Sequence, residues 1–204
     1  MEKINLYTKQ HIKSLEVLKE TGIIINKEEY VRKHMMDIFP MFSFWYGKFI
    51  EMVEKRIPRP AHTEYPLWCS VSQKNCMKPD EISVVYCLQV PKDRIIYFDS
   101  MKWDRVLNNL YIPKDEKDWK DFQNEIKELG VKDEFNFIMG RYKGMFPHIE
   151  KKIIDSWERI FDIDHFDEFQ VQANIWEIKE EWIRHVVCQG EDLFEIAKDM
   201  IDDY

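Results

Sequence analysis

The pattern of apolar and polar positions predicts short strands near the start, middle and end of the chain, with amphipathic helices between them. Residues 82–90, ISVVYCLQV, are almost continuously apolar, which indicates an interior strand. Apolar residues at spacings of three and four, as in residues 103–110, predict helices. Strands and helices do not alternate as they do in a Rossmann domain. We therefore expect an α+β fold with one or two curved, antiparallel-rich sheets and helices clustered between the strands.

The 204 residues predict a single α+β domain over residues 1–190 and an acidic amphipathic helix over residues 191–204 that packs on it. Hydrophobic residues make up 45% of the chain, which is enough to build a core of this size. The apolar stripe of the last helix is expected to face its own core, because that is where such stripes normally pack. A partner-binding tail is the alternative.

Local signals predict the first elements. Residues 4–8 are expected to form a strand, and Thr8 is expected to cap a helix that begins at Lys9. Gly22 supplies a left-handed stop for that helix. Residues 94–98 are expected to return from the interior strand as an antiparallel hairpin.

Residues 170–178 predict a long strand near the end of the chain, followed by a turn and a second strand through Val187. Side chains alternate along a strand, so two amides and an indole share one face, and three apolar residues share the other. The polar face predicts a wall for a polar, ring-containing ligand. The alternative is that the amides are satisfied within the sheet and the indole belongs to the core. The polar face consists of Gln172, Asn174 and Trp176.

The composition excludes several classes of protein. A net charge of −8 argues against a general nucleic-acid-binding protein. No run reaches the roughly 18 to 20 apolar residues that a membrane helix needs, and the first residues lack the apolar core of a signal peptide. The four cysteines form no CxxC pair, which favours reduced thiols. We therefore expect a cytoplasmic protein that does not associate with membranes.

The common chemical motifs are absent from the sequence. It contains no glycine-rich phosphate loop, no GxSxG and no HExxH, and it has only six glycines. The acidic stretch DIDHFDE around His165 lacks the glycine and the terminal glutamate of a calcium loop. We expect no metal site. A catalytic triad assembles in space and leaves no fixed spacing, and nothing in the sequence favours one.

Five stretches of the chain together resemble a family of bacterial proteins known only as a domain of unknown function. The resemblance covers most of residues 4–188, so the acidic terminal helix is expected to be an addition to the family. The family implies no established activity. The stretches are LYTKQHIKSLEVLKETGI, YPLW, VPKDRIIYFDSMKWDRVLN, SWERIFDI and VQANIWEIKEEWIRHV.

The order of elements also resembles, more remotely, the ADP-ribosyltransferase fold, in particular DNA-modifying toxins of the DarT kind. The resemblance implies NAD as the cofactor. It places Thr8 near the ligand-gripping His or Arg of the first strand, and Tyr65 and Trp68 in the aromatic middle strand. Gln172 and Asn174 then stand at the Gln-x-Glu motif of the last strand. These five residues are the expected cofactor-binding residues.

This sequence departs from the ADP-ribosyltransferase pattern at the catalytic position. Asn174 brings no negative charge, and losing one preorganised electrostatic group typically costs on the order of 10²- to 10³-fold in rate. Glu177 is the best remaining carboxylate. It lies three positions after Asn174, so its side chain is expected on the opposite face of the strand unless the strand bulges. Asn174 and Glu177 are the expected catalytic residues.

Three functions follow from these observations. The first is an ADP-ribosyltransferase-like enzyme that passes ADP-ribose from NAD to a macromolecule whose identity the sequence does not give. The second is a non-catalytic nucleotide- or protein-binding module of that fold, acting in bacterial or phage conflict. The absent glutamate favours this second reading. The third is a structural or interaction protein, because a shared fold does not establish a reaction.

Overall fold

The computed structural model describes residues 2–200, apart from the side chain of His34. The chain divides into two compact units. Unit 1 combines the N-terminal residues up to Tyr97 with those from His165 onward, and unit 2 is Phe98–Asp164. The division expected after residue 190 stays a prediction.

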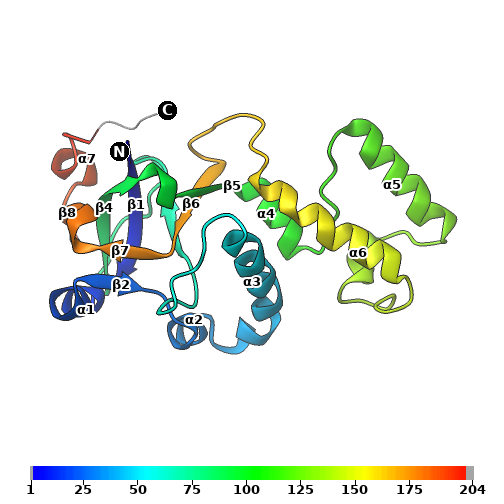
Figure 1. The fold of residues 1–204 in the computed structure, drawn as a ribbon, viewed down its shortest axis with the longest axis horizontal. Helices are drawn as coiled ribbons and strands as arrows, with labels where there is room; N and C mark the ends of the chain where they lie inside the picture. The colour runs from blue at the N-terminus through cyan, green and yellow to red at the C-terminus, as the bar shows by residue number, and fades with distance from the viewer. Residues whose placement is uncertain (1, 201–204) are drawn as a thin grey trace. The chain divides into compact units, whose positions relative to one another are not determined.

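A six-stranded sheet forms the centre of unit 1, with the strand order β5-β6-β3-β1-β4-β8 (Figure 1). The pairs β1–β3, β1–β4, β3–β6 and β4–β8 are all antiparallel. This arrangement confirms the expected α+β class with a mostly antiparallel sheet. The strands are β1 (Lys3–His11), β3 (Leu67–Ser70), β4 (Ser83–Pro91), β5 (Ile96–Asp99), β6 (Val171–Ile175) and β8 (Ile183–Val187).

The interior position of β4 is confirmed, because it lies between β1 and β8 and its residues 84–88 have no exposed surface. Its pairing with β1 corrects the expected start of the first helix. All nine residues of β1 are paired, from Lys3 opposite Pro91 to His11 opposite Ser83. Thr8 is therefore a strand residue and not a helix cap. The ladder keeps the chain extended until His11, so helix α1 begins only at Ser14.

The expected hairpin between residues 82–90 and 94–98 does not form. Both edges of β4 are occupied, by β1 and β8, so β5 lies at the far edge of the sheet beside β6. The short 3₁₀ helix η2 (Lys92–Arg94) turns the chain between the two strands.

The expected long strand over residues 170–178 is broken. β6 ends at Ile175, Trp176 forms a bend, and β7 (Glu177–Lys179) pairs with β2 (Ile23–Ile25) in a separate two-stranded sheet (Figure 1). The indole of Trp176 is 5% exposed and donates a hydrogen bond to the Ile57 carbonyl at 2.9 Å, which holds the bend. The last strand, β8, then returns to the opposite edge of the main sheet.

The helices of the N-terminal half follow their local signals. α1 spans Ser14–Thr21 and ends at Gly22, whose φ of 72° is the expected left-handed stop. α2 spans Glu28–Met35, and the 3₁₀ helix η1 (Met36–Ile38) leads into α3 (Phe39–Glu54), with Pro40 in its first turn. No helix among residues 2–200 has the length and apolar character needed to cross a bilayer.

The C-terminal segment packs on the sheet near β1, β4 and β8. Leu193, Ala197 and Met200 join a buried cluster with Tyr7 and Cys87. The helix is shorter than expected, since α7 spans only Leu193–Ile196. Positions 201–204 of the predicted helix lie outside the described residues. The buried Gln73 amide reinforces the docking, because it donates hydrogen bonds to the carbonyls of Ala197 at 3.0 Å and Met200 at 2.9 Å.

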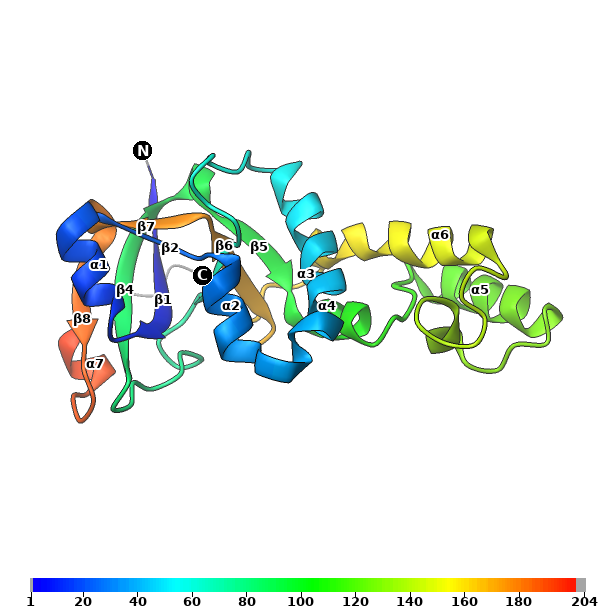
Figure 2. The same cartoon turned by 90° about the horizontal axis from the view of Figure 1, so that it is seen from below.

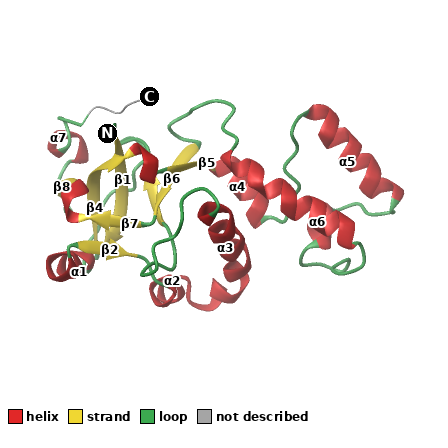
Figure 3. Cartoon of the chain, in the orientation of Figure 1, coloured by secondary structure: helices red, strands yellow, loops and turns green. Residues whose placement is uncertain are grey.

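Unit 2 is helical, and residues 100–164, all of them described, contain helices and loops without a strand (Figure 3). Asp99 and Asp115 accept hydrogen bonds from the first turns of α4 and α5, so each residue caps the helix that follows it. The helices are α4 (Ser100–Leu107), α5 (Glu116–Glu128), η3 (Glu134–Phe137), α6 (Pro147–Ser156) and η4 (Trp157–Phe161).

The core of unit 2 forms where α5 and α6 lie side by side (Figure 2). Lys152 of α6 forms an ion pair of 2.6 Å with Glu125 of α5. The ring of Tyr111 stacks on Phe122 with centroids 4.2 Å apart. Trp157 is fully buried and donates from its indole to the Leu110 carbonyl at 3.0 Å.

Candidate functional site

The sheet brings Trp68, Gln172 and Asn174 to one face of two neighbouring strands. Trp68 lies directly opposite Asn174, and Ser70 lies opposite Gln172. Paired residues share a face of the sheet, as do residues two positions apart along a strand. The ladder therefore brings Trp68 beside Asn174 and Gln172, although more than 100 positions separate Trp68 from either residue.

The Trp68–Asn174 end of this face is packed. Asn174 has no exposed surface, and its Nδ2 donates to the Leu67 carbonyl at 3.3 Å. The Trp68 ring stacks on Phe49 of α3 at 4.9 Å between centroids and meets Tyr46 edge-on at 5.8 Å. Aromatic side chains of α3 therefore pack against Trp68, where the resemblance placed the cofactor.

Thr8 lies on the other face of the sheet. Tyr7 is opposite Ser70, which shares its face with Gln172, so the next residue along β1 points away from them. The Thr8 hydroxyl is 2% exposed and donates to the Trp68 carbonyl at 2.7 Å. Its side chain also hydrogen-bonds the buried thiol of Cys69, whose pKa is raised by burial more than that bond lowers it. Thr8 thus links β1 to β3 through its hydroxyl group.

Tyr65 precedes β3 and is not part of it, because it forms an isolated antiparallel bridge with Asn26. Its side chain is 9% exposed, and its ring lies 6.5 Å from that of Tyr46. Burial raises the pKa of its hydroxyl, and the nearby carboxylates of Glu28 and Glu64 raise it further. Tyr65 therefore helps to hold α3 against the start of β3.

Glu177 lies on the small sheet, opposite Ile25. Its Oε2 is 2.8 Å from His62 Nε2, and its Oε1 is 3.4 Å from Lys179 Nζ. The bend at Trp176 removes it from the ladder that holds Asn174. The two expected catalytic residues thus occupy different sheets, and Glu177 is the one that retains some solvent exposure, at 13% of its side chain.

A hollow of about 770 Å³ lies elsewhere in unit 1, between the start of β1, the start of β5 and the loop before β6. Tyr97, Phe166 and Phe169 supply its aromatic surface. Tyr97 and Phe166 meet edge-to-face with centroids 5.9 Å apart, and Phe169 is 58% exposed. The volume falls within the range of about 300–1,000 Å³ that is usual for small-molecule sites.

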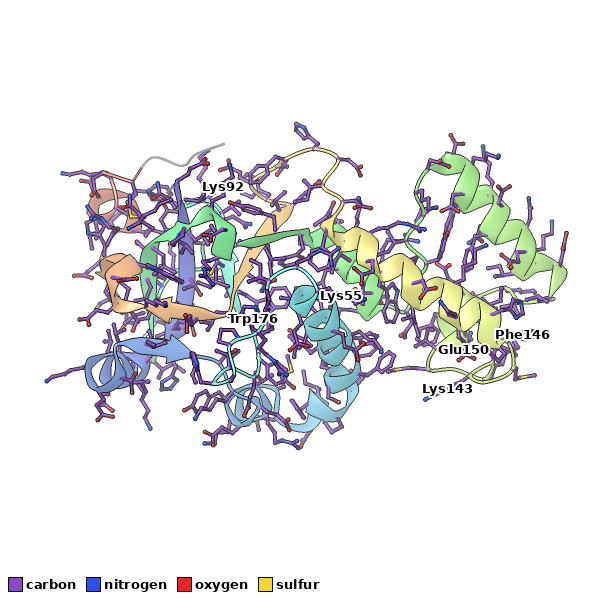
Figure 4. All side chains as sticks on the ribbon, in the orientation of Figure 1. Lys55, Lys92, Lys143, Phe146, Glu150 and Trp176 are labelled. Carbon is purple, nitrogen blue, oxygen red and sulfur yellow. The ribbon has the colours of Figure 1, made fainter. Side chains whose placement is uncertain are left out.

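Charged side chains surround this aromatic surface. Lys92, labelled in Figure 4, forms an ion pair of 3.0 Å with Glu2, and Lys74 forms one of 2.9 Å with Glu168. Both lysine side chains are more than half exposed, so these pairs contribute little and a ligand can replace them. With Asp167, three carboxylates and two lysines line the hollow, which therefore carries a small negative charge.

The sequence signal for this hollow was present but weak. Phe166 and Phe169 lie in the acidic stretch before β6. They follow neither a strand period nor a helix period, so the sequence predicts no core position for these two large apolar side chains. Its other residues come from four separate stretches of the chain, and no spacing rule connects them. The described residues contain no group of three or more His, Cys, Asp or Glu side chains placed to hold a metal ion.

These features define an α+β protein whose mostly antiparallel sheet has a helical unit inserted between β5 and β6. Residues 5–184 match the model of a domain of unknown function, DUF3841, and the chain belongs to that family. The expected resemblance to an uncharacterised domain family is confirmed. No curated protein and no solved structure matches the chain.

Proposed function

We propose that this protein is a non-catalytic nucleotide-binding module, and that the hollow lined by Tyr97, Phe166 and Phe169 is its site. The exposed ring of Phe169 is the observation that carries the proposal. Bases stack on exposed aromatic side chains, each such contact being worth about 1–3 kcal/mol. An apolar ring of this size without a core to enter offers that surface.

The charges of the hollow favour NAD among the common nucleotides. Its carboxylates suit the ribose hydroxyls, which donate hydrogen bonds, while Lys74 and Lys92 suit the phosphates. A triphosphate would bring more negative charge to a lining that is already slightly negative. The positive nicotinamide ring of NAD offsets one of its phosphate charges. We therefore expect NAD to bind more tightly than ATP.

The absence of turnover is proposed from the two expected catalytic residues. Asn174 is neutral, fully buried and bonded to the Leu67 carbonyl. Glu177 lies on another sheet and interacts with His62 and Lys179. Neither residue lines the hollow, so no carboxylate at these positions would stabilise the positive charge that develops when nicotinamide leaves.

Isothermal titration calorimetry with NAD tests the binding. Phe169→Ala should weaken it about tenfold or more, as expected for the loss of one stacked base. Phe135→Ala is the matched control, because Phe135 is a comparably exposed phenylalanine (50%) of unit 2. Gln172→Ala distinguishes the hollow from the face of β6. Weaker binding in Gln172→Ala together with unchanged binding in Phe169→Ala would show that the nucleotide binds on the β6 face. Absence of heat at millimolar NAD would contradict nucleotide binding and would favour a protein-interaction role.

ADP-ribosyl transfer is the second candidate function. The observation in its favour is the contact between Glu177 Oε2 and His62 Nε2, which joins a carboxylate to a largely exposed imidazole. Mass spectrometry for released nicotinamide decides between the two functions. Release that disappears in Glu177→Gln would establish transfer or hydrolysis, and binding without release would support the non-catalytic module.

A further inference from the structure

Unit 2 contains a second hollow, of about 360 Å³, whose lining is basic although the protein carries a net charge of −8. Two carboxylates, Asp118 and Asp155, also line it. The cationic residues outnumber them two to one and are Lys114, Lys151, Lys152 and Arg159.

One wall of the hollow is a polar stripe on α6. His148, Lys151, Lys152 and Asp155 follow one another at intervals of three, one and three positions, which places them on one side of the helix. The opposite side of α6 supplies Ile149 and Ile153 to the core. The stripe therefore presents its cations to the hollow because the helix can bury only its apolar side.

The facing wall is built around Tyr111 and Asp118. Asp118 Oδ2 accepts hydrogen bonds from the Tyr111 hydroxyl at 2.8 Å and from the backbone N–H of Lys114 at 2.8 Å. Desolvation raises the pKa of Asp118, but these bonds and the nearby Arg159 outweigh it, so the pKa lies below its ordinary value. Asp118 is thus an ionised, already satisfied anchor that fixes this wall.

The cations differ in how far they are already engaged. Lys151 pairs with Asp155, and Lys152 pairs with Glu125 of α5. Arg159 donates to the Ile112 carbonyl and lies 3.7 Å from Asp118. Within residues 2–200, the side chains of Lys114 and His148 have no hydrogen-bond or ion-pair partner. The hollow therefore holds donors that the protein itself leaves unused.

We propose that this hollow binds the phosphate group of a small molecule, with Lys114, His148 and Arg159 as its main donors. Arginine and lysine side chains are the usual ligands of phosphate oxygens, and bonds between ionised partners are the strong ones. The Lys151–Asp155 pair is weak because both side chains are largely exposed, so Lys151 can leave Asp155 and bind a dianion. The volume lies at the lower end of the range for ligand sites, which favours a phosphate with a small substituent.

The test is titration of the full chain with ribose 5-phosphate, inorganic phosphate and ribose at low ionic strength, followed by calorimetry. The two phosphate compounds should bind and ribose should not. Lys114→Gln and His148→Gln should each weaken binding about tenfold, the usual effect of losing one hydrogen bond to a charged group. Lys117→Gln, which changes an exposed lysine of α5 outside the hollow, should leave affinity within about twofold.

The outcomes separate the proposal from its alternatives. Tighter binding of ribose 5-phosphate than of inorganic phosphate identifies phosphate monoesters as the ligands, and equal binding identifies free phosphate. Either result supports a phosphate site. Absence of heat with both compounds on the order of 10 mM would overturn it, since any dissociation constant would then lie above that concentration. Equal weakening by Lys114→Gln and Lys117→Gln would also overturn it, because it would indicate diffuse charge attraction.

Discussion

Asn174 lies directly opposite Trp68 in the β3–β6 ladder. Its side chain has no exposed surface. One amide atom, Nδ2, donates to the Leu67 carbonyl, whereas Oδ1 has no hydrogen-bond partner among residues 2–200. The neutral amide is therefore suited to its packed surroundings, and a carboxylate is not.

Asn174→Asp should lower the free energy of unfolding by about 3 kcal/mol at pH 7, because it places an unpaired charge in the core. At pH 4 the loss should be smaller, since a buried carboxyl with a raised pKa is protonated there. Urea unfolding at both pH values measures the difference. Asn174→Leu is the matched control and should cost about 1 kcal/mol, as it loses one hydrogen bond but no longer buries an unpaired oxygen. Equal losses for both variants would contradict the packed environment of Asn174.

Glu134 should make the stability of the protein depend on pH. Burial raises the pKa of its carboxyl from 4.5 to about 7, against the opposing effect of Arg105 at 3.6 Å. The folded state then binds more protons than the unfolded state, so the free energy of unfolding should fall as pH rises from about 4.5 to 7. The total change attributable to this group is on the order of 3 kcal/mol.

Glu134→Gln isolates this contribution. The variant should be more stable than the wild type at pH 8, and the two should converge near pH 4. Urea unfolding across this range gives the difference, and Glu128→Gln, at an exposed position of α5, should show no such trend. A constant difference between wild type and Glu134→Gln at all pH values would show that Glu134 titrates normally.

The four cysteines should differ sharply in reactivity. Cys188 is exposed, whereas Cys69 and Cys87 are buried and Cys76 is partly buried. Burial raises the pKa of the Cys76 and Cys87 thiols to about 12, so little reactive thiolate forms at pH 8. Iodoacetamide should therefore modify Cys188 first, as mass spectrometry of the native protein would show. The Cys188→Ser variant should remove this fast phase, and rapid labelling of Cys87 would contradict its place in the core.

Local chemistry in the sequence predicted the parts of the fold that depend on neighbouring residues. Gly22 ends α1 as expected, because a left-handed stop acts within a few positions of the chain. The sheet order was beyond such signals. The place of β5 depends on which edge of the sheet remains free, and β1 stays extended through Thr8 because of partners about 80 positions away.

Local signals likewise predicted only part of the candidate site. Alternation along β6 correctly predicted that Gln172 and Asn174 share a face with each other. It did not predict that α3 would place Phe49 on Trp68, because helix docking follows no sequence period. The hollow beside Phe169 joins residues as far apart in the sequence as Glu2 and Phe169, so only the folded structure brings them together.

Saturation-transfer NMR with NAD shows whether the hollow at Phe169 binds a nucleotide. Transfer from the protein to the ring protons of NAD is expected in the wild type and in Phe135→Ala, and it should be much weaker in Phe169→Ala at the same NAD concentration. Transfer that is absent at millimolar NAD, or that is unchanged in Phe169→Ala, would contradict nucleotide binding in this hollow.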